Sequence, residues 1–335
     1  MEIYEIKKGI KVYLIESNFT AIITRSPEAS GSITIPKVFE HNKKNYRITI
    51  VADSSFSNCK KLSSLFFSDD SDVTHIEGNA FNESSISTLS LPPKLEHLGD
   101  RWCYGTKNLV NIKIPDKLSN RFQLYEGKLL IGSSLLTNHF FCNFNNGNCI
   151  TGSFLYGKDG LMNKHDVLFF ASRKIEMSTI PANVRIINDY AFENCENLKS
   201  LIFNQNIEEI RREAFSNCKN LRNEICFPNS LRKIGYGAFR NNENLTHIKL
   251  KSDFIVFESE CFKGCKKLEE IEILSASKII FKAHSFDDVN SNYKIYIPPG
   301  VKIDGSDYVA EHISENVIKL SSSLADRLAA TQPAI

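Results

Sequence analysis

The chain has 335 residues, of which 42% are hydrophobic and 24% are charged. These proportions are typical of a folded protein and exclude a largely disordered one. Its 41 basic and 39 acidic residues give a formal net charge of +2, which does not indicate a general binder of nucleic acids or membrane surfaces.

The N-terminal sequence MEIYEIKKGIKVYLIE carries scattered charges and no apolar core of signal-peptide length. No stretch of the chain reaches the roughly 18 uncharged apolar residues of a membrane-spanning helix. From these patterns we expect no membrane span and no secretion by the usual route, which leaves the cytoplasm as one candidate compartment.

The first 48 residues have the pattern of short strands. Apolar and polar residues alternate over 1–30, which predicts two or three strands, and GSITIP at 31–36 predicts another that ends at proline. Residues 41–46 are polar enough for a turn, and 47–51 return as a strand. We interpret 1–48 as an N-terminal β cap leading into the first repeat, because the first coil of a stacked array must be covered.

A repeated unit follows, seen in full at 187–203 as INDYAFENCENLKSLIF. An apolar residue, aliphatic in most units, lies five positions before an anchor residue, and further apolar residues follow the anchor at fixed offsets. The anchors are Phe56, Phe81, Cys103, Phe192, Phe215, Phe239, Phe262 and Phe286. Their spacing is 22 to 25 residues except for one gap of 89. A repeat that keeps its phase in this way predicts a solenoid of stacked coils.

Each unit contains two local patterns. The L-x-x-I-x-I segment alternates like a strand, and the A-F-x-x-C-x-x-L segment has the spacing of a short helix or 3-10 turn on the opposite side of the coil. No single unit can bury its own anchor, so the core forms by stacking. We therefore predict an α/β solenoid in two parts, 49–119 and 179–300.

The gap between these parts predicts a β-hairpin insertion over 120–178. Residues 122–131 and 154–170 are two similar segments, each with an aromatic start, a glycine turn and an apolar return strand. The motif STIP at 178–181 then restores the repeat. Whether the insertion stacks within the solenoid stays open.

The C-terminal region, 301–335, is predicted to hold a helix and a tail. Val317, Leu320, Leu324 and Leu328 fall on one helical face. The helix either caps the last coil or binds a partner or a second copy.

The nine cysteines do not suggest a metal or disulfide framework. Cys59, Cys195, Cys218 and Cys265 each lie three residues after an anchor, so one repeat position explains them as buried, reduced thiols. The pair Cys261 and Cys265 and the loose group His139, Cys142 and Cys149 have no complementary pair at zinc spacing. We expect no metal and no cofactor.

No catalytic motif is present in the sequence. It contains no nucleotide-binding glycine pattern, no H-E-x-x-H and no G-x-S-x-G. His165 and Asp166 are adjacent but have no nucleophile attached, so we interpret them as a surface pair. The sequence therefore predicts a protein that is not an enzyme.

Two columns of residues are predicted to point outward from the strands, towards the concave face. The central column is Phe66, Ser90, Lys113, Ile202, Cys226, Lys249, Glu272 and Tyr296. The column two residues earlier is Ser64, Thr88, Asn111, Ser200, Glu224, His247, Glu270 and Lys294. Their mixed charge disfavours a nucleic-acid groove.

Three residues of the central column are large and apolar, namely Phe66, Ile202 and Tyr296. Such residues on a solvated face suggest contact with a protein ligand. The alternative is that flanking loops or the hairpin insertion cover them.

The unit I-x-x-x-A-F-x-x-C-x-x-L-x-x-I-x-I-P closely resembles the BspA-like, or Treponema pallidum-type, leucine-rich repeat. The matching residues lie in 51–115 and 187–298, and GSITIP followed by the strand at 46–51 also resembles the family's first repeat. The resemblance implies a right-handed solenoid with its strands on the concave side. It also implies a microbial surface protein that adheres to host or neighbouring cells through protein–protein contacts.

Two functions from different classes follow. The first is a surface adhesin or host-interaction protein, which the resemblance supports. The second is an intracellular leucine-rich repeat scaffold for a cytosolic partner, which the charged N-terminus and the reduced-thiol interpretation support. Both would use the concave face, so only the compartment separates them.

Overall fold

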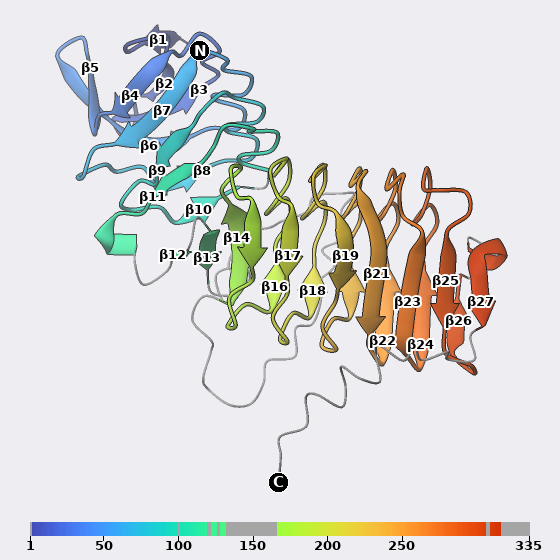
Figure 1. The fold of residues 1–335 in the computed structure, drawn as a ribbon. Coiled ribbons are helices and arrows are strands. Elements are labelled where there is room, and N and C mark those ends of the chain that lie inside the picture. The colour runs from blue at the N-terminus through green and yellow to red at the C-terminus, as the bar shows by residue number, and fades with distance from the viewer. Residues whose placement is uncertain are drawn as a thin grey trace.

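The structure is a computed structural model that describes residues 2–99, 101–118, 122–125, 128–131, 166–305 and 309–315. The chain winds as a parallel β-solenoid, and successive coils stack their strands side by side (Figure 1). The predicted solenoid is therefore confirmed. The helix predicted around 317–328 and the first part of the hairpin predicted at 154–170 lie outside the described residues.

The N-terminal cap and the first coils share one seven-stranded sheet. Its strands are β1 (Ile3–Glu5), β2 (Lys11–Ile15), β3 (Thr20–Thr24), β5 (Val38–His41), β6 (Lys44–Val51), β8 (His75–Ile76) and β10 (His97–Leu98). Strands β1, β2 and β3 pair antiparallel, which confirms the strands predicted for 1–30. The pairing is parallel from β3 through β6 and β8 to β10. Antiparallel pairing in the cap is thus followed, in the same sheet, by the parallel pairing of the coils.

A second sheet runs along the same coils and has four parallel strands. They are β4 (Gly31–Ile35), β7 (Leu62–Phe67), β9 (Thr88–Ser90) and β11 (Asn111–Lys113). A short 3-10 helix, η1 (Asp116–Leu118), follows. These two sheets form what we call the first stack.

The remaining coils form a second stack, which also has two sides. One side is a nine-stranded sheet of β12 (Phe122–Tyr125), β13 (Lys128–Ile131), β14 (Val167–Ala171), β16 (Ile186–Ile187), β18 (Glu209–Ile210), β20 (Lys233–Ile234), β22 (Phe254–Phe257), β24 (Lys278–Phe281) and β26 (Lys302–Asp304). Strands β12 and β13 pair antiparallel as the hairpin predicted at 122–131, and β13 continues onto β14.

The other side of the second stack consists of two sheets. Strands β15 (Met177–Thr179) and β17 (Ser200–Ile202) form the first, and the second comprises β19 (Asn223–Cys226), β21 (Leu245–Lys251), β23 (Glu270–Ser275), β25 (Lys294–Ile297) and β27 (Ile313–Glu315). The 3-10 helix η5 (Ala310–His312) precedes β27. Each coil thus contributes strands to two sides, whereas the sequence pattern predicted one strand per coil.

The corner of each coil is a pair of turns and not a helix. Backbone N–H groups donate to carbonyls three residues earlier, as from Cys59 to Phe56, but the pattern does not continue. The reason is that residues two before and two after each anchor have positive φ, which ends a right-handed helix. These pairs are Ser54 and Asn58, Asn79 and Glu83, Arg101 and Gly105, Tyr190 and Asn194, Glu213 and Asn217, Gly237 and Asn241, Glu260 and Gly264, and His284 and Asp288.

The anchors stack on one another inside these corners. Phe192, Phe215, Phe239, Phe262 and Phe286 form a continuous row with ring centroids 4.7, 5.0, 5.3 and 5.5 Å apart. All of these rings are buried, and the planes of successive rings are nearly parallel. Aromatic burial of this kind dominates core energetics, so the row holds the coils together.

The repeated cysteine position lies behind the anchor and makes a hydrogen bond to the preceding coil. Cys59 Sγ donates to Ser26 O at 3.0 Å, Cys218 Sγ to Phe192 O at 3.1 Å, and Cys265 Sγ to Phe239 O at 3.2 Å. Burial raises the pKa of Cys265 to about 12. Among the described cysteines all seven are free, six of them buried, which confirms the buried thiols of the repeat position.

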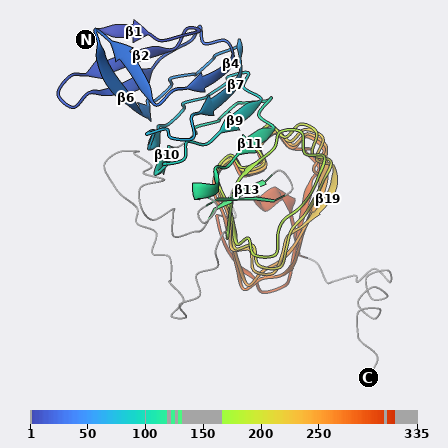
Figure 2. The ribbon, with the colours of Figure 1, turned by 90° about the vertical axis from the view of Figure 1, so that its left-hand side faces the viewer.

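The two stacks have separate cores that meet at β14. Val167 and Phe169 pack into the core of the first stack, whereas Leu168 and Ala171 pack into that of the second. Trp102, from the last corner of the first stack, lies 5.8 Å from Phe170 between ring centroids. The strands of the two stacks point in different directions (Figure 2). All five residues of β14 are buried, so this strand is the structural junction.

Replacing a ring in the middle of the row tests its role. We expect Phe215→Ala to lower the free energy of unfolding by about 3–5 kcal/mol, because a cavity opens between two stacked rings. Phe254→Ala is the matched control, since Phe254 is 37% exposed. Urea unfolding measures both, and equal losses would contradict the stacking argument.

The left-handed corner residues give a second test. At Asn58, where φ is 59°, we expect Ala to be less stable than Gly, since a β-carbon in this region costs roughly 1–2 kcal/mol. This order is the reverse of that in regular helices and strands, where Gly is the less stable residue. Thermal unfolding of Asn58→Ala and Asn58→Gly would show it, and the usual order would refute it.

Candidate functional site

The structure aligns the predicted outward columns within each sheet. Glu224, His247, Glu270 and Lys294 are successive partners across β19, β21, β23 and β25. Cys226, Lys249, Glu272 and Tyr296 are partners in the same way. In the first stack, Ser64 pairs with Thr88, Thr88 with Asn111, and Ser90 with Lys113.

The columns do not form one uninterrupted ladder. Ser200 and Ile202 pair with Met177 and Thr179 of β15, in a sheet of their own. Among the described strands, the sheet of β11 and the sheet of β19 are each separate from it. The predicted face is therefore divided into three sections, with β15 and β17 in the middle.

The charged side chains of the last section pair with one another. Lys249 Nζ lies 2.8 Å from Glu224 Oε2 and 3.8 Å from Glu272 Oε2, and His247 Nε2 lies 3.7 Å from Glu270 Oε2. Burial raises the pKa of Glu224, but hydrogen bonds from Cys226 and Lys249 outweigh it and leave the pKa below its ordinary value. The result is a mosaic of paired charges, which provides little net field for attracting a charged ligand.

The three large apolar residues of the central column differ in exposure. Phe66 is half-buried, because Lys113 Nζ lies 5.1 Å from its ring centroid, across the small Ser90. Tyr296 is also half-buried. Ile202 is 58% exposed, and Met177 on the adjacent strand β15 is 70% exposed. The apolar surface of the face is thus concentrated on β15 and β17.

Sequence reasoning missed Met177, although a signal was present. The motif STIP at 178–181 matches the strand end of the other repeats, so the residue before it had to lie on the same strand. The insertion predicted for 120–178 includes this residue. In the structure β14 takes the place of the missing corner.

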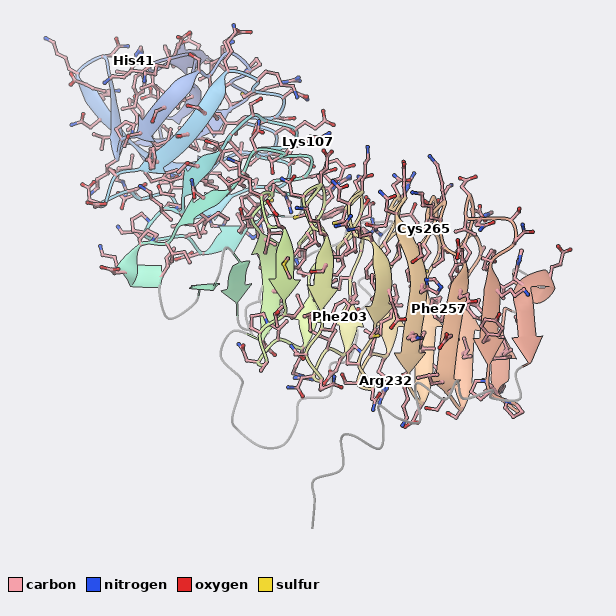
Figure 3. The ribbon with its side chains drawn as sticks, in the orientation of Figure 1. His41, Lys107, Phe203, Arg232, Phe257 and Cys265 are labelled. Atoms are coloured by element: carbon pink, nitrogen blue, oxygen red, sulfur yellow. The ribbon has the colours of Figure 1, made fainter. Side chains whose placement is uncertain are left out.

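A polar cavity of about 340 Å³ lies at the corners where the two stacks meet. Tyr104, Gly105 and Lys107 line it from the first stack, and Glu193 and Asn194 line it from the second. Lys107 marks the place in Figure 3. Gly105 has φ of +68° and lies so close to Glu83 that a β-carbon would be 2.8 Å from Glu83 Cγ. Glycine adopts this φ without strain, and any larger residue here would require the Glu83 side chain to shift.

Glu193 connects the stacks across this cavity. Its side chain is 1% exposed, and its Oε2 accepts a hydrogen bond from the Gly105 N–H at 3.1 Å. Burial raises the pKa of Glu193 to about 7, although Arg173 and the Gly105 N–H act in the opposite direction. The chain therefore holds a carboxyl group at the junction that changes its charge near neutral pH.

The same repeat fills most of the chain, and one family of proteins is built from it. The family described as BspA type leucine rich repeat region matches residues 37–125 and 165–294, in six copies. The chain is a BspA-type leucine-rich repeat protein. The resemblance stated from the sequence motif is therefore confirmed.

Solved structures show the same fold. The BspA-type chain is similar to a leucine rich cell surface protein from Faecalibacterium prausnitzii, at 18% identity and a TM-score of 0.56, over 95% of this chain and 99% of that one. It is also similar to a leucine-rich repeat protein from Eubacterium ventriosum, at 14% identity and a TM-score of 0.56, over 96% and 97%. Among curated proteins, none matches the chain.

Arg173 is the cation of the junction in this BspA-type chain. It is 2% exposed, and its guanidinium donates to Ala191 O at 3.0 Å and lies 4.7 Å from the Phe170 ring centroid. Sequence reasoning identified neither Arg173 nor Glu193. Glu193 occupies the position after the anchor, where residues as different as Ser57, Tyr104 and Lys263 stand in other coils, so the repeat pattern offered no signal for it.

In the described part of the chain, no three His, Cys, Asp or Glu side chains are grouped so that they could hold a metal ion. No helix within the described ranges is long and apolar enough to cross a membrane.

The raised pKa of Glu193 predicts a pH-dependent stability. Since the native state binds this proton more tightly than the unfolded chain, whose pKa is about 4.5, native stability falls as pH rises from about 4.5 to 7. At about 1.4 kcal/mol per pKa unit, Glu193→Gln should gain up to about 3 kcal/mol over wild type between pH 4.5 and pH 8.

Urea unfolding at pH 5 and pH 8 measures this gain. Glu196→Gln is the matched control, since Glu196 lies in the same corner and its side chain is 45% exposed. An advantage of Glu193→Gln that is the same at both pH values would contradict the assignment.

Proposed function

We propose that this BspA-type protein is not an enzyme and binds a protein partner through the outward face of its sheets, centred on β15 and β17. The observation that carries this proposal is the exposure of Met177 and Ile202 on neighbouring strands. Large apolar side chains that protrude from an otherwise polar face are typical of contact surfaces. Leucine-rich repeat proteins of this kind are, moreover, typically binding scaffolds.

The surroundings of this apolar centre support the same function. Glu176 and Lys199, which flank Met177 and Ser200 in sequence, form an exposed ion pair at 2.9 Å. The mosaic of paired charges on β19, β21 and β23 continues the polar surroundings. An apolar centre with a polar rim is the usual anatomy of a protein–protein interface. The predicted columns, from Phe66 to Tyr296, would supply the rest of the contact area.

The site of action that we propose is the cell surface, where the protein would act as an adhesin for host or neighbouring cells. The similar protein from Faecalibacterium prausnitzii is described as a cell surface protein. An impermeant labelling reagent applied to intact source cells tests this proposal. Labelling before lysis is expected, and protection until lysis would contradict it.

A second candidate, an intracellular scaffold, is favoured by one specific observation. The seven described cysteines are all free, although surface proteins in oxidising surroundings often carry disulfides. Protection from the impermeant reagent would support this candidate and direct the search for partners to the cytosol.

Substitutions at the apolar centre test the binding face itself. We expect Met177→Lys with Ile202→Lys to weaken binding of a cross-linked partner at least tenfold, because a charge would be buried at the contact. Phe254→Lys is the matched control, since Phe254 is 37% exposed on β22, which belongs to the nine-stranded sheet on the other side of the second stack. Affinity measured by biolayer interferometry should separate the two.

Truncations distinguish the centre from the rest of the face. Ile202→Ala should cost more affinity than Phe66→Ala or Tyr296→Ala, since both of those side chains are half-buried in the free protein. If none of the three alters the affinity, the outward columns do not form the binding face.

A further inference from the structure

The second stack ends at strands β26 and β27, which lie at the end of the molecule away from the first stack (Figure 1). β26 pairs with β24 and β27 pairs with β25, and no other described strand continues either sheet. Each strand therefore presents one open edge of backbone N–H and C=O groups. Natural proteins cover such an edge, often with a helix or a loop, because it can otherwise pair with another chain.

The apolar residues of this last coil are only partly covered. Ile303 pairs with Ile279 across the ladder, but Ile279 is fully buried whereas Ile303 is half-buried. Ile313 stands in the same relation to the fully buried Ile295. Val301 is also half-buried and packs against the same core. The end of the second stack is therefore an apolar face that no described residue covers completely.

The N-terminal end of the protein is closed in a different way. Ile33 and Ile35 lie on β4, which is an edge strand too, yet both residues are buried. They share one core with Ile10 and Val12 of the N-terminal cap. A stacked array needs such a cap at both of its ends. At the C-terminal end, the described chain provides no equivalent of these cap strands beyond β27.

The segment that follows β27 has the sequence of an end cap. Its apolar residues at helical spacing are Val317, Leu320, Leu324 and Leu328. Asn316 directly precedes them, and asparagine is a preferred N-cap residue. A helix over 317–330 would be about 21 Å long and would have one apolar face. Because β27 ends at Glu315, this segment begins beside the last coil and has a high effective concentration there, which a separate molecule lacks.

We propose that residues 317–330 form a helix whose apolar face docks on the end of the last coil and covers Val301, Ile303 and Ile313. The polar side of this helix, which includes Ser322 and Asp326, faces water. The docked helix closes the second stack and blocks pairing of its open edges with a second copy of the chain. This inference concerns the end of the solenoid and does not depend on the proposed protein-binding face.

Hydrogen–deuterium exchange of the full-length protein tests the docking. We expect Leu320→Asp with Leu324→Asp to speed exchange of the β26 and β27 amides at least tenfold, because burying these charges is costly and an undocked helix leaves the last coil free to open. The amides of β16 and β18, inside the same nine-stranded sheet as β26, should exchange at the wild-type rate. The milder Leu324→Ala should give a smaller increase in the same two end strands.

Ser322→Asp with Ala329→Asp is the matched control. It adds the same two charges to the opposite side of the proposed helix, so exchange in β26 and β27 should stay at the wild-type rate. An equal increase in the control and in Leu320→Asp with Leu324→Asp would contradict docking through the apolar face.

Light scattering after size-exclusion chromatography identifies what covers the last coil. We expect the mass of a single chain for the wild type and for all variants. A wild-type dimer that Leu320→Asp with Leu324→Asp dissociates would assign the end of the stack to a second copy. Exchange in β26 and β27 that neither Leu324→Ala nor the double variant alters would show that the segment does not dock there. Either result would overturn the proposal.

Discussion

The row of stacked aromatic rings inside the corners is the interaction on which the rest of the structure depends. A coil of about 23 residues cannot cover a phenylalanine by itself, so each ring is buried only by its neighbours. The left-handed residues on either side of each anchor bend the chain sharply enough to hold the ring inward. Both sheets, and every side chain that they present outward, take their spacing from this row.

The junction between the stacks shows what happens where the row is interrupted. Cys103 stands in the anchor position, Trp102 takes over part of its packing, and β14 supplies residues to two cores. The polar groups of Arg173 and Glu193 are buried at this place. A break in the regular core therefore coincides with a polar pocket at the corners where the stacks meet.

Much of the fold could be predicted from the sequence, and the parts that could not have physical reasons. The phase of the anchors predicted the solenoid, and the outward columns followed from alternation along each strand. The second sheet was missed because strands such as β16 and β18 have two residues each, too few for a period to be visible. The corner was predicted as helical because its spacing is helical, although Asn at the position two after the anchor already indicated a left-handed turn. Arg173 and Glu193 lie far apart from Gly105 in sequence, and no local pattern could bring them together.

The place of Trp102 has a practical consequence. It is the one tryptophan of the whole chain, it is 4% exposed, and it sits where the two stacks meet. The intrinsic fluorescence of the protein at long excitation wavelength therefore comes from a single indole at this contact. Its emission reports, without any label, the packing of the junction and of the last corner of the first stack.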